Sequence, residues 1–253
     1  MSSGTVFTSK NQKIATITFG HPASNSFPTE LLHRLIDTII RVSEDKEINM
    51  IILKSEGEKS FCAGAFFDEL LAIESEEQGT AFFNGFADLM NAMRKSPKII
   101  MARVQGKAVG GGVGIAAAAD YCYATEAADI KLSELSIGLG PFVIAPAVER
   151  KIGKSGLTQL TLAAHEWQTA YWAKEKGLFA KVFENIREMD EEIELFSSKI
   201  SGYSTEGLAA LKAVLWKGTE DWDTLLPEYA ALNGKLVLSE FTKDALKKFK
   251  NKS

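Results

Sequence analysis

Short apolar runs in the first half of the chain predict strands. Residues 13–19 (K-I-A-T-I-T-F) alternate between apolar and polar positions, which is typical of a strand with one buried face. Residues 49–55 and 99–104 are mostly apolar, as in strands that are buried on both faces. We expect two shorter strands at residues 120–124 and 129–132. These runs indicate a sheet that lies inside the protein.

The segments between these runs have apolar residues at helical spacing, and so does the rest of the chain. Residues 31–44 and 74–95 each place their apolar side chains on one face, and Pro97 follows the second of them. Shorter helices are expected to begin near Phe66 and over residues 113–119. Further helices are expected at residues 142–152, 156–164, 170–176, 190–201, 205–217, 221–238 and 240–250. Strands that alternate with helices favour an α/β fold with largely parallel strands, followed by a helical tail.

Composition and charge exclude several classes of protein. The chain has 253 residues, is 45% hydrophobic and carries a net charge of −4 without a long basic block, so we expect no nucleic-acid partner. Its first residues lack the pattern of a signal peptide, and no apolar run is long enough to span a membrane. Two cysteines and three scattered histidines have no metal-ligand spacing. We therefore expect a cytoplasmic protein without a metal or a membrane partner.

A glycine-rich stretch lies at the centre of the sequence. Gly110, Gly111 and Gly112 stand between an apolar run and an alanine-rich helical pattern. Such a turn can present backbone N–H groups to an anion or an oxyanion, or it can simply allow tight packing. A phosphate-binding P-loop is a poor fit to residues 110–114, because the Gly-Lys-Ser/Thr ending is missing. Residues 62–65 (C-A-G-A), which precede the helix near Phe66, are a second place where N–H groups could face a ligand.

Two loops and one acid, in this order, resemble the enoyl-CoA hydratase/isomerase (crotonase) family. The matching segments are F-C-A-G-A at 61–65, V-Q-G-K-A-V-G-G-G at 104–112, Asp120, Glu134, Pro22 with Asn25, and A-K-E-K-G-L at 173–178. The resemblance covers nearly the whole chain. It implies a crotonase-like spiral of β-β-α units with an acyl-CoA site in residues 1–195. It also implies a C-terminal helical region, residues 196–253, that packs on the core and on neighbouring subunits of a homotrimer or a dimer of trimers.

The resemblance also implies a role for individual residues. The backbone amides of Ala65 and Gly111 correspond to the family's oxyanion hole, which binds the thioester carbonyl oxygen, and Glu134 corresponds to a catalytic acid/base. Contacts with the substrate are implied for Ala23, Ala63, Gly64, Phe66, Phe67, Gly110 and Phe142. The substrate is an acyl-CoA thioester, and no cofactor is expected because coenzyme A is part of that substrate. The chemistry needs this arrangement because a thioester α-proton is too weakly acidic to leave unless the enolate is stabilised.

One departure from the family pattern decides the expected reaction. Hydratases of this family have a first glutamate two residues after the third glycine, where this chain has Gly114. A single glutamate at the position of Glu134 is the pattern of the isomerases, in which one base moves a proton from C2 to C4. The resemblance therefore predicts conversion of a 3-enoyl-CoA to a 2-enoyl-CoA. Residues 140–144 (G-P-F-V-I) are bulkier than the usual family segment, and they would narrow the pocket or exclude water.

Other functions stay open at this point. A hydratase could use a non-standard second acid, with Asp68 and Glu69 as candidates, and a non-catalytic member could bind acyl-CoA without turnover. Thioesterase activity also stays open. Aryl-CoA dehalogenation is set aside because Phe142 stands where that chemistry needs an aspartate. The lysines between Lys243 and Lys252 either form a solvated helix end or contact the CoA phosphates.

Overall fold

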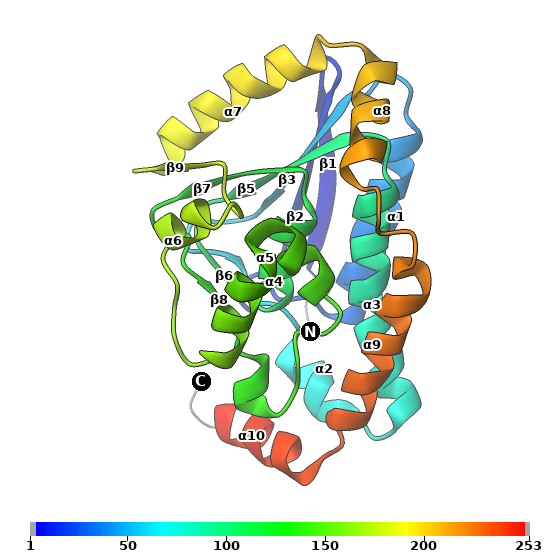
Figure 1. Cartoon of the computed structure of the whole chain (residues 1–253), viewed down its shortest axis with the longest axis vertical. Coiled ribbons are helices and arrows are strands. Elements are labelled where there is room, and N and C mark those ends of the chain that lie inside the picture. Colours follow the sequence, from blue (N-terminus) through cyan, green and yellow to red (C-terminus); the bar gives the residue numbers. More distant parts are fainter. Residues whose placement is uncertain (1–3, 251–253) are drawn as a thin grey trace.

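The computed structural model describes residues 4–250 and contains two sheets surrounded by helices (Figure 1). The larger sheet has the strand order β1-β2-β3-β5-β7-β9, and the smaller has the order β4-β6-β8. All neighbouring strands are parallel except β1 and β2. The strands are β1 (Thr5–Asn11), β2 (Ile14–Gly20), β3 (Met50–Ser55), β4 (Ser60–Cys62), β5 (Ile99–Val104), β6 (Lys107–Val109), β7 (Tyr121–Thr125), β8 (Ile130–Lys131) and β9 (Lys181–Phe183).

The helices follow the periodicity of the sequence. They are α1 (Thr29–Glu44), α2 (Phe67–Ala72), α3 (Glu76–Lys95), α4 (Gly111–Ala118), the 3₁₀ helix η1 (Glu134–Ile137), α5 (Ala145–Leu162), α6 (Ala170–Glu175), α7 (Ile186–Ser201), α8 (Thr205–Leu215), α9 (Trp222–Leu236) and α10 (Glu240–Lys250). The two helices expected at residues 142–152 and 156–164 form the single element α5, which is interrupted at Gly153 by a backbone φ of +71°.

The order of elements forms a spiral. The chain passes from β3 in the large sheet to β4 in the small sheet and then to α2 and α3. It repeats this path through β5, β6 and α4, and again through β7, β8 and η1. This confirms the predicted crotonase-like α/β spiral of β-β-α units. Four strands were missed: β4, β6 and β9 have only three residues each and are too short for a periodic signal, and β1 is a mostly exposed edge strand.

Both faces of the large sheet are buried, which explains the continuous apolar runs. In β3, Ile51 and Leu53 belong to the main core with α1 and α3, whereas Met50 and Ile52 pack under α7 on the other face. Because successive side chains of a strand point to opposite faces, a strand covered on both sides needs apolar residues at every position. The two sheets and their helices therefore enclose a main core and a second, smaller apolar cluster.

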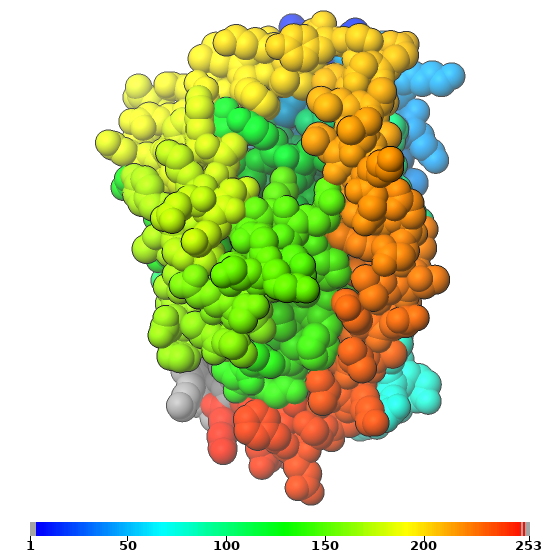
Figure 2. Space-filling view, in the orientation of Figure 1, coloured from blue at the N-terminus to red at the C-terminus, as the bar shows by residue number. Residues whose placement is uncertain are grey.

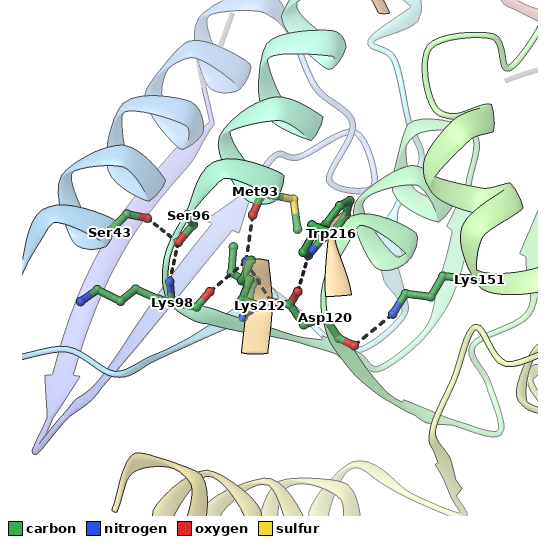
Figure 3. Close-up of polar contacts among 9 residues, drawn as sticks. Ser43, Met93, Ser96, Lys98, Asp120, Lys151, Lys212 and Trp216 are labelled. Carbon is green, nitrogen blue, oxygen red and sulfur yellow. Dashed lines mark hydrogen bonds and ion pairs between the residues drawn. The ribbon is translucent and has the colours of Figure 1, made fainter. Parts of the chain in front are cut away.

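The C-terminal helices pack on the core through a buried polar network (Figure 3). Lys212 Nζ on α8 lies 2.9 Å from Asp120 Oδ2 and donates to the backbone oxygens of Met93 and Lys98 at 2.9 and 2.8 Å. Trp216 Nε1 donates to the other oxygen of Asp120 at 2.7 Å. This network ties α8 to the C-terminal end of α3 and to the start of β7. The predicted division between residues 195 and 196 falls inside α7, and it stays a prediction.

Within residues 4–250, no helix is both long and apolar enough to cross a membrane.

Candidate active site

Three loops meet because they follow three neighbouring parallel strands. Ala65 follows β4, Gly111 follows β6 and Glu134 follows β8, and these strands are adjacent in the small sheet. Parallel strands have their carboxyl ends at the same edge, so residues that follow them converge even when they are far apart in sequence. All three residues line one pocket.

The loop that carries Ala65 is held by the turn between β2 and α1. Phe27 N donates to Gly64 O at 2.8 Å, and Phe66 N donates to Phe27 O at 3.1 Å. Phe27 and Ala65 form an isolated parallel bridge, in which the bonds of Phe27 go to the two neighbours of Ala65. The N–H of Ala65 itself therefore points away from Phe27, on the side of the pocket.

Asn25 fixes the turn that holds this loop. Its Nδ2 donates to the backbone oxygens of Glu56 and Ser60 at 2.8 and 2.9 Å, and its Oδ1 accepts from His21 N at 3.0 Å. The backbone of Asn25 has a φ of +56°, a conformation that asparagine tolerates better than most residues. Sequence reasoning noted Asn25 only as part of the resemblance and gave it no structural role.

Glycine is needed both in the loop before α4 and in the loop that carries Ala65. Gly110 has a φ of +53°, and a Cβ atom placed on it would lie 2.7 Å from Oε1 of Glu134. A Cβ atom on Gly64 would lie 3.2 Å from the nitrogen of Gly111, so the two loops are in contact. Gly111 is the first residue of α4, and a backbone N–H at this position has no partner within its own helix. The amides of Ala65 and Gly111 thus come from two adjoining loops at one pocket.

The carboxyl group of Glu134 lies in a mostly apolar pocket. Its Oε2 is buried and has no hydrogen-bond partner among the residues that the structure describes, although the residue as a whole is partly exposed. Burial raises the pKa of Glu134 to about 7, and a hydrogen bond from its own backbone N–H opposes this shift in part. The group can therefore hold or release a proton near neutral pH.

The remainder of the pocket is almost entirely apolar. Its apolar side chains, besides Ala63, Ala65 and Val109, are Phe67, Leu70, Phe83, Phe86, Ile137, Leu139, Pro141, Val143 and Ile144. The polar side chains are those of Ser133, Glu134 and Asn233, so Glu134 is the one ionisable residue of the described lining. An isolated carboxyl beside two backbone donors in an apolar cavity is suited to proton transfer next to a developing oxyanion.

The sequence profile described as enoyl-CoA hydratase/isomerase matches residues 9–252. The chain belongs to the enoyl-CoA hydratase/isomerase family. It is 29% identical to the short-chain-enoyl-CoA hydratase of Clostridium acetobutylicum, over 98% of this chain and 95% of that protein. It is also 25% identical to the peroxisomal Δ(3,5)-Δ(2,4)-dienoyl-CoA isomerase of Arabidopsis thaliana, over 81% of this chain and 78% of that protein.

The fold agrees with this family membership. A crystal structure of an enoyl-CoA hydratase from Bacillus halodurans superposes with a TM-score of 0.89, at 24% identity, covering 96% of this chain and 99% of that one. Because relatives of both names are similar to this chain, membership makes it an enzyme of the hydratase or the isomerase class. The choice between the two reactions depends on the residues in its own pocket.

The structure separates the expected substrate contacts of this family member into two groups. Four of them line the pocket beside Ala65, Gly111 and Glu134, namely Ala63, Gly64, Phe67 and Gly110. The other three expected contacts, Ala23, Phe66 and Phe142, do not. Ala23 is exposed, the ring of Phe66 packs edge-on against His21 with centroids 4.9 Å apart, and the ring of Phe142 covers Gly140. The role of each residue in binding stays a prediction.

The two candidates for a second acid are engaged elsewhere. Glu69 accepts from the backbone nitrogen and hydroxyl of Thr29 at 2.8 and 2.7 Å, at the start of α1. Asp68 forms an ion pair with Lys250 at 2.8 Å. Neither lines the pocket, so neither is placed to act as the second acid of a hydratase. Lys243 Nζ donates to the backbone oxygen of Ile73, the residue after α2, whereas Lys252 lies outside the described residues.

Sequence reasoning missed what occupies the space beside Gly114. A Cβ atom placed on Gly114 would lie 2.4 Å from Cγ2 and 2.7 Å from Cβ of Ile144. Ile144 is 4% exposed and lines the pocket. The bulky segment 140–144 was noted in the sequence, but the contact between residues thirty positions apart was not predictable from it.

Proposed function

We propose that this chain moves the double bond of a 3-enoyl-CoA to the 2-position, with Glu134 as the single acid/base. The observation that carries this proposal is the buried, unpartnered Oε2 of Glu134 in a described lining that holds no second ionisable residue. Burial raises the pKa of this carboxyl to about 7, so that both of its protonation states are accessible near neutral pH.

The proposed reaction runs in two proton transfers. The thioester oxygen accepts hydrogen bonds from the amides of Ala65 and Gly111, and the carboxylate of Glu134 removes a proton from C2. The electron pair of that C–H bond delocalises into a dienolate, whose negative oxygen the two amides stabilise; one such donor typically contributes about 3–4 kcal/mol. Glu134 then returns its proton to C4, which leaves the double bond between C2 and C3. A base with a pKa near the working pH suits both steps.

The pocket favours isomerisation over hydration. Addition of water to a double bond needs a polar group to hold and deprotonate the water, in addition to the acid that protonates carbon. At Gly114 the side chain of Ile144 fills the available space, and the surrounding wall is apolar. A hydratase with a non-standard acid is the second candidate, but Asp68 and Glu69 lie outside the pocket. The proposed proton shift needs no cofactor, because coenzyme A enters as part of the substrate.

An activity panel tests the proposal. We expect wild-type protein to convert 3-hexenoyl-CoA to the 2-enoyl product and to hydrate crotonyl-CoA much more slowly. Glu134→Gln should lower isomerisation by at least about 100-fold, because proton transfer loses its base. Asp68→Asn, which changes an exposed acid outside the pocket, is the control and should keep the wild-type rate. Unchanged turnover in Glu134→Gln would refute the mechanism.

The same panel separates the alternatives. Faster hydration than isomerisation would favour the hydratase, and hydrolysis of the thioester would favour a thioesterase. Acyl-CoA binding without any turnover would favour a non-catalytic member.

We also propose that the chain forms a homotrimer or a dimer of trimers. On α8, Leu211, Val214 and Leu215 have spacings that place them on one face, and they are 50%, 70% and 50% exposed. On α9, Leu232 and Leu236 are also exposed. Helices α8 and α9 lie along one side of the molecule (Figure 2). Exposed apolar side chains grouped in this way support contact with another subunit. The cytoplasmic location stays a prediction from the sequence.

A further inference from the structure

The side chain of Asn233, near the C-terminal end of α9, forms two hydrogen bonds with the backbone of a single residue in the pocket wall. Its Oδ1 accepts from Gly140 N at 3.1 Å, and its Nδ2 donates to Gly140 O at 2.9 Å. Asn233 is 3% exposed, Gly140 is also buried, and both line the pocket. Loss of the amide would leave a buried N–H and a buried C=O of Gly140 unpaired, which is unfavourable. The pair therefore holds the backbone at Gly140 in one orientation.

Gly140 directly follows the turn that carries Glu134. Glu134 begins the 3₁₀ helix η1, which ends at Gly138 with a left-handed φ of +81°. Leu139 N donates to Glu134 O at 3.0 Å and closes this helix, as is common where a helix ends in a left-handed glycine. The backbone of Glu134 is thereby tied to the residue immediately before Gly140. The hydrogen bonds of Asn233 consequently act on the segment that carries the carboxyl group of Glu134.

Helix α9 is itself fixed by a backbone contact with α3. A Cβ atom placed on Gly79 of α3 would lie 2.8 Å from Cα of Gly234, which is the residue after Asn233. Only glycine permits two helices to approach this closely. Helix α3 also packs against the oxyanion loop, because a Cβ atom on Gly111 would lie 2.4 Å from Cε1 of Phe86. Asn233 thus joins the segment with the proposed base to the helix that packs against the oxyanion loop.

We propose that Asn233 is a positioning residue of this enzyme, which holds the backbone at Gly140 so that the carboxyl group of Glu134 stays at a fixed place beside the amides of Ala65 and Gly111. Asn233 takes no part in the chemistry, because its amide oxygen and amide nitrogen are both bonded to Gly140. The inference rests on the function proposed above, in which Glu134 moves a proton between two carbon atoms. Proton transfer depends steeply on the place of the base, and a displacement of about 1 Å can lower a rate about 100-fold.

Steady-state kinetics of Asn233→Leu test the proposal. Leucine has the same branched shape as asparagine but forms no hydrogen bonds with its side chain. We expect kcat for 3-hexenoyl-CoA to fall about 100-fold and KM to change less than about threefold, because the base is displaced while the rest of the pocket still binds the thioester. Titration calorimetry with hexanoyl-CoA should likewise show nearly wild-type affinity. Asn233→Ser keeps one hydroxyl group and should lose less activity, and it serves if the leucine variant does not fold.

Asn49→Leu is the matched control. Asn49 is likewise a buried asparagine, 2% exposed, whose Nδ2 donates to Ser201 O at 3.0 Å and whose Oδ1 accepts from Thr205 Oγ1 at 2.8 Å. It lies just before β3, it bonds that strand to the C-terminal helices, and it does not line the pocket. We expect this variant to lose stability, as Asn233→Leu does, and to keep the wild-type kcat and KM.

Hydrogen exchange separates this inference from the proposed reaction. Backbone amides of residues 134–140 should exchange at least about tenfold faster in Asn233→Leu than in wild type, and at the wild-type rate in Asn49→Leu. If wild type isomerises the substrate, an unchanged kcat in Asn233→Leu, or equal losses of kcat in the two leucine variants, would overturn the inference. Faster exchange in Asn233→Leu alone, together with a wild type that isomerises no enoyl-CoA, would refute only the proposed reaction.

Discussion

Gly114 and Ile144 share one space in the pocket wall, because a Cβ atom on Gly114 would lie 2.4 Å from Cγ2 of Ile144. The two residues come from different elements, α4 and the segment before α5. Any side chain at position 114 would have to displace Ile144. The absence of an acid at this position and the presence of a bulky apolar side chain beside it are therefore one structural feature.

A double-mutant cycle should detect this coupling. Gly114→Ala should lower the free energy of unfolding by about 1–3 kcal/mol, because the new methyl group overlaps Ile144. Ile144→Ala should cost about 2–5 kcal/mol through loss of buried contacts. The double variant should be less destabilised than the sum, since the smaller side chain leaves room for the methyl group. Urea unfolding of the three variants measures this.

Gly207→Ala provides the control for that cycle. Gly207 is an exposed helical residue at which a Cβ atom meets nothing closer than 3.4 Å, so its effect should add to that of Ile144→Ala. Strict additivity at Gly114 as well would contradict the shared space. Ile144→Ala should also raise the ratio of hydration to isomerisation, if Ile144 excludes water.

The raised pKa of Glu134 predicts that activity depends on pH. Because the catalytic form is the carboxylate and burial raises its pKa to about 7, kcat/KM should increase with pH and level off above about pH 7. An ordinary glutamate would give this limb near pH 4.5. A pH profile of the wild type from pH 5 to 9 measures it, and a flat profile over this range would contradict the assignment.

The carboxyl group of Glu134 should also make the folded protein less stable as pH increases. A carboxyl whose pKa is raised on folding binds its proton more tightly in the native state, so stability falls as pH increases from about 4.5 through about 7. The full effect is up to about 3 kcal/mol. Glu134→Gln removes this dependence, and it should therefore be more stable than wild type at pH 8 but not at pH 4.5. Thermal unfolding at the two pH values tests this, and an equal difference at both would contradict it.

The buried pair of Lys212 and Asp120 should be important for stability (Figure 3). Lys212→Met removes the cation that lies 2.9 Å from Asp120 and leaves that carboxylate buried without its counter-charge. Loss of one partner of a buried pair typically costs about 3–5 kcal/mol. Arg187→Ala, which breaks the exposed pair of Arg187 with Glu191, should cost less than about 1 kcal/mol. Chemical denaturation compares the two, and similar small effects would contradict the role of the buried pair.

The exposed face of α8 should control the assembly state. Replacing Leu211 and Val214 together by serine removes two of the most exposed apolar side chains on this helix without touching its buried face, where Leu208 and Lys212 lie. We expect the wild type to elute as a trimer or hexamer in light-scattering chromatography and the variant to shift towards monomer. A wild type that is monomeric at micromolar concentration would refute the proposed assembly.

Some elements of this fold carry a local sequence signal and others do not. Helices such as α1 and α3 were predicted within about two residues, because their apolar faces repeat over many turns. The missed strands β4 and β6 have three residues each, and they form only because their neighbours in the small sheet supply hydrogen bonds. These are also the strands that bring Ala65 and Gly111 to one edge, so the site is built on elements without a local signal.

The sequence by itself determined the order of the two amide-bearing loops and the acid, because glycine and small residues are required wherever backbone must approach a ligand or another loop. It also determined that position 114 lacks a carboxylate. Only the tertiary structure decided that Ile144 fills that position and that Asp68 and Glu69 lie outside the pocket. It also decided the raised pKa of Glu134. Each of these features is a contact or a burial between segments that lie far apart in the chain, and such proximity arises only when the hydrophobic core brings the segments together.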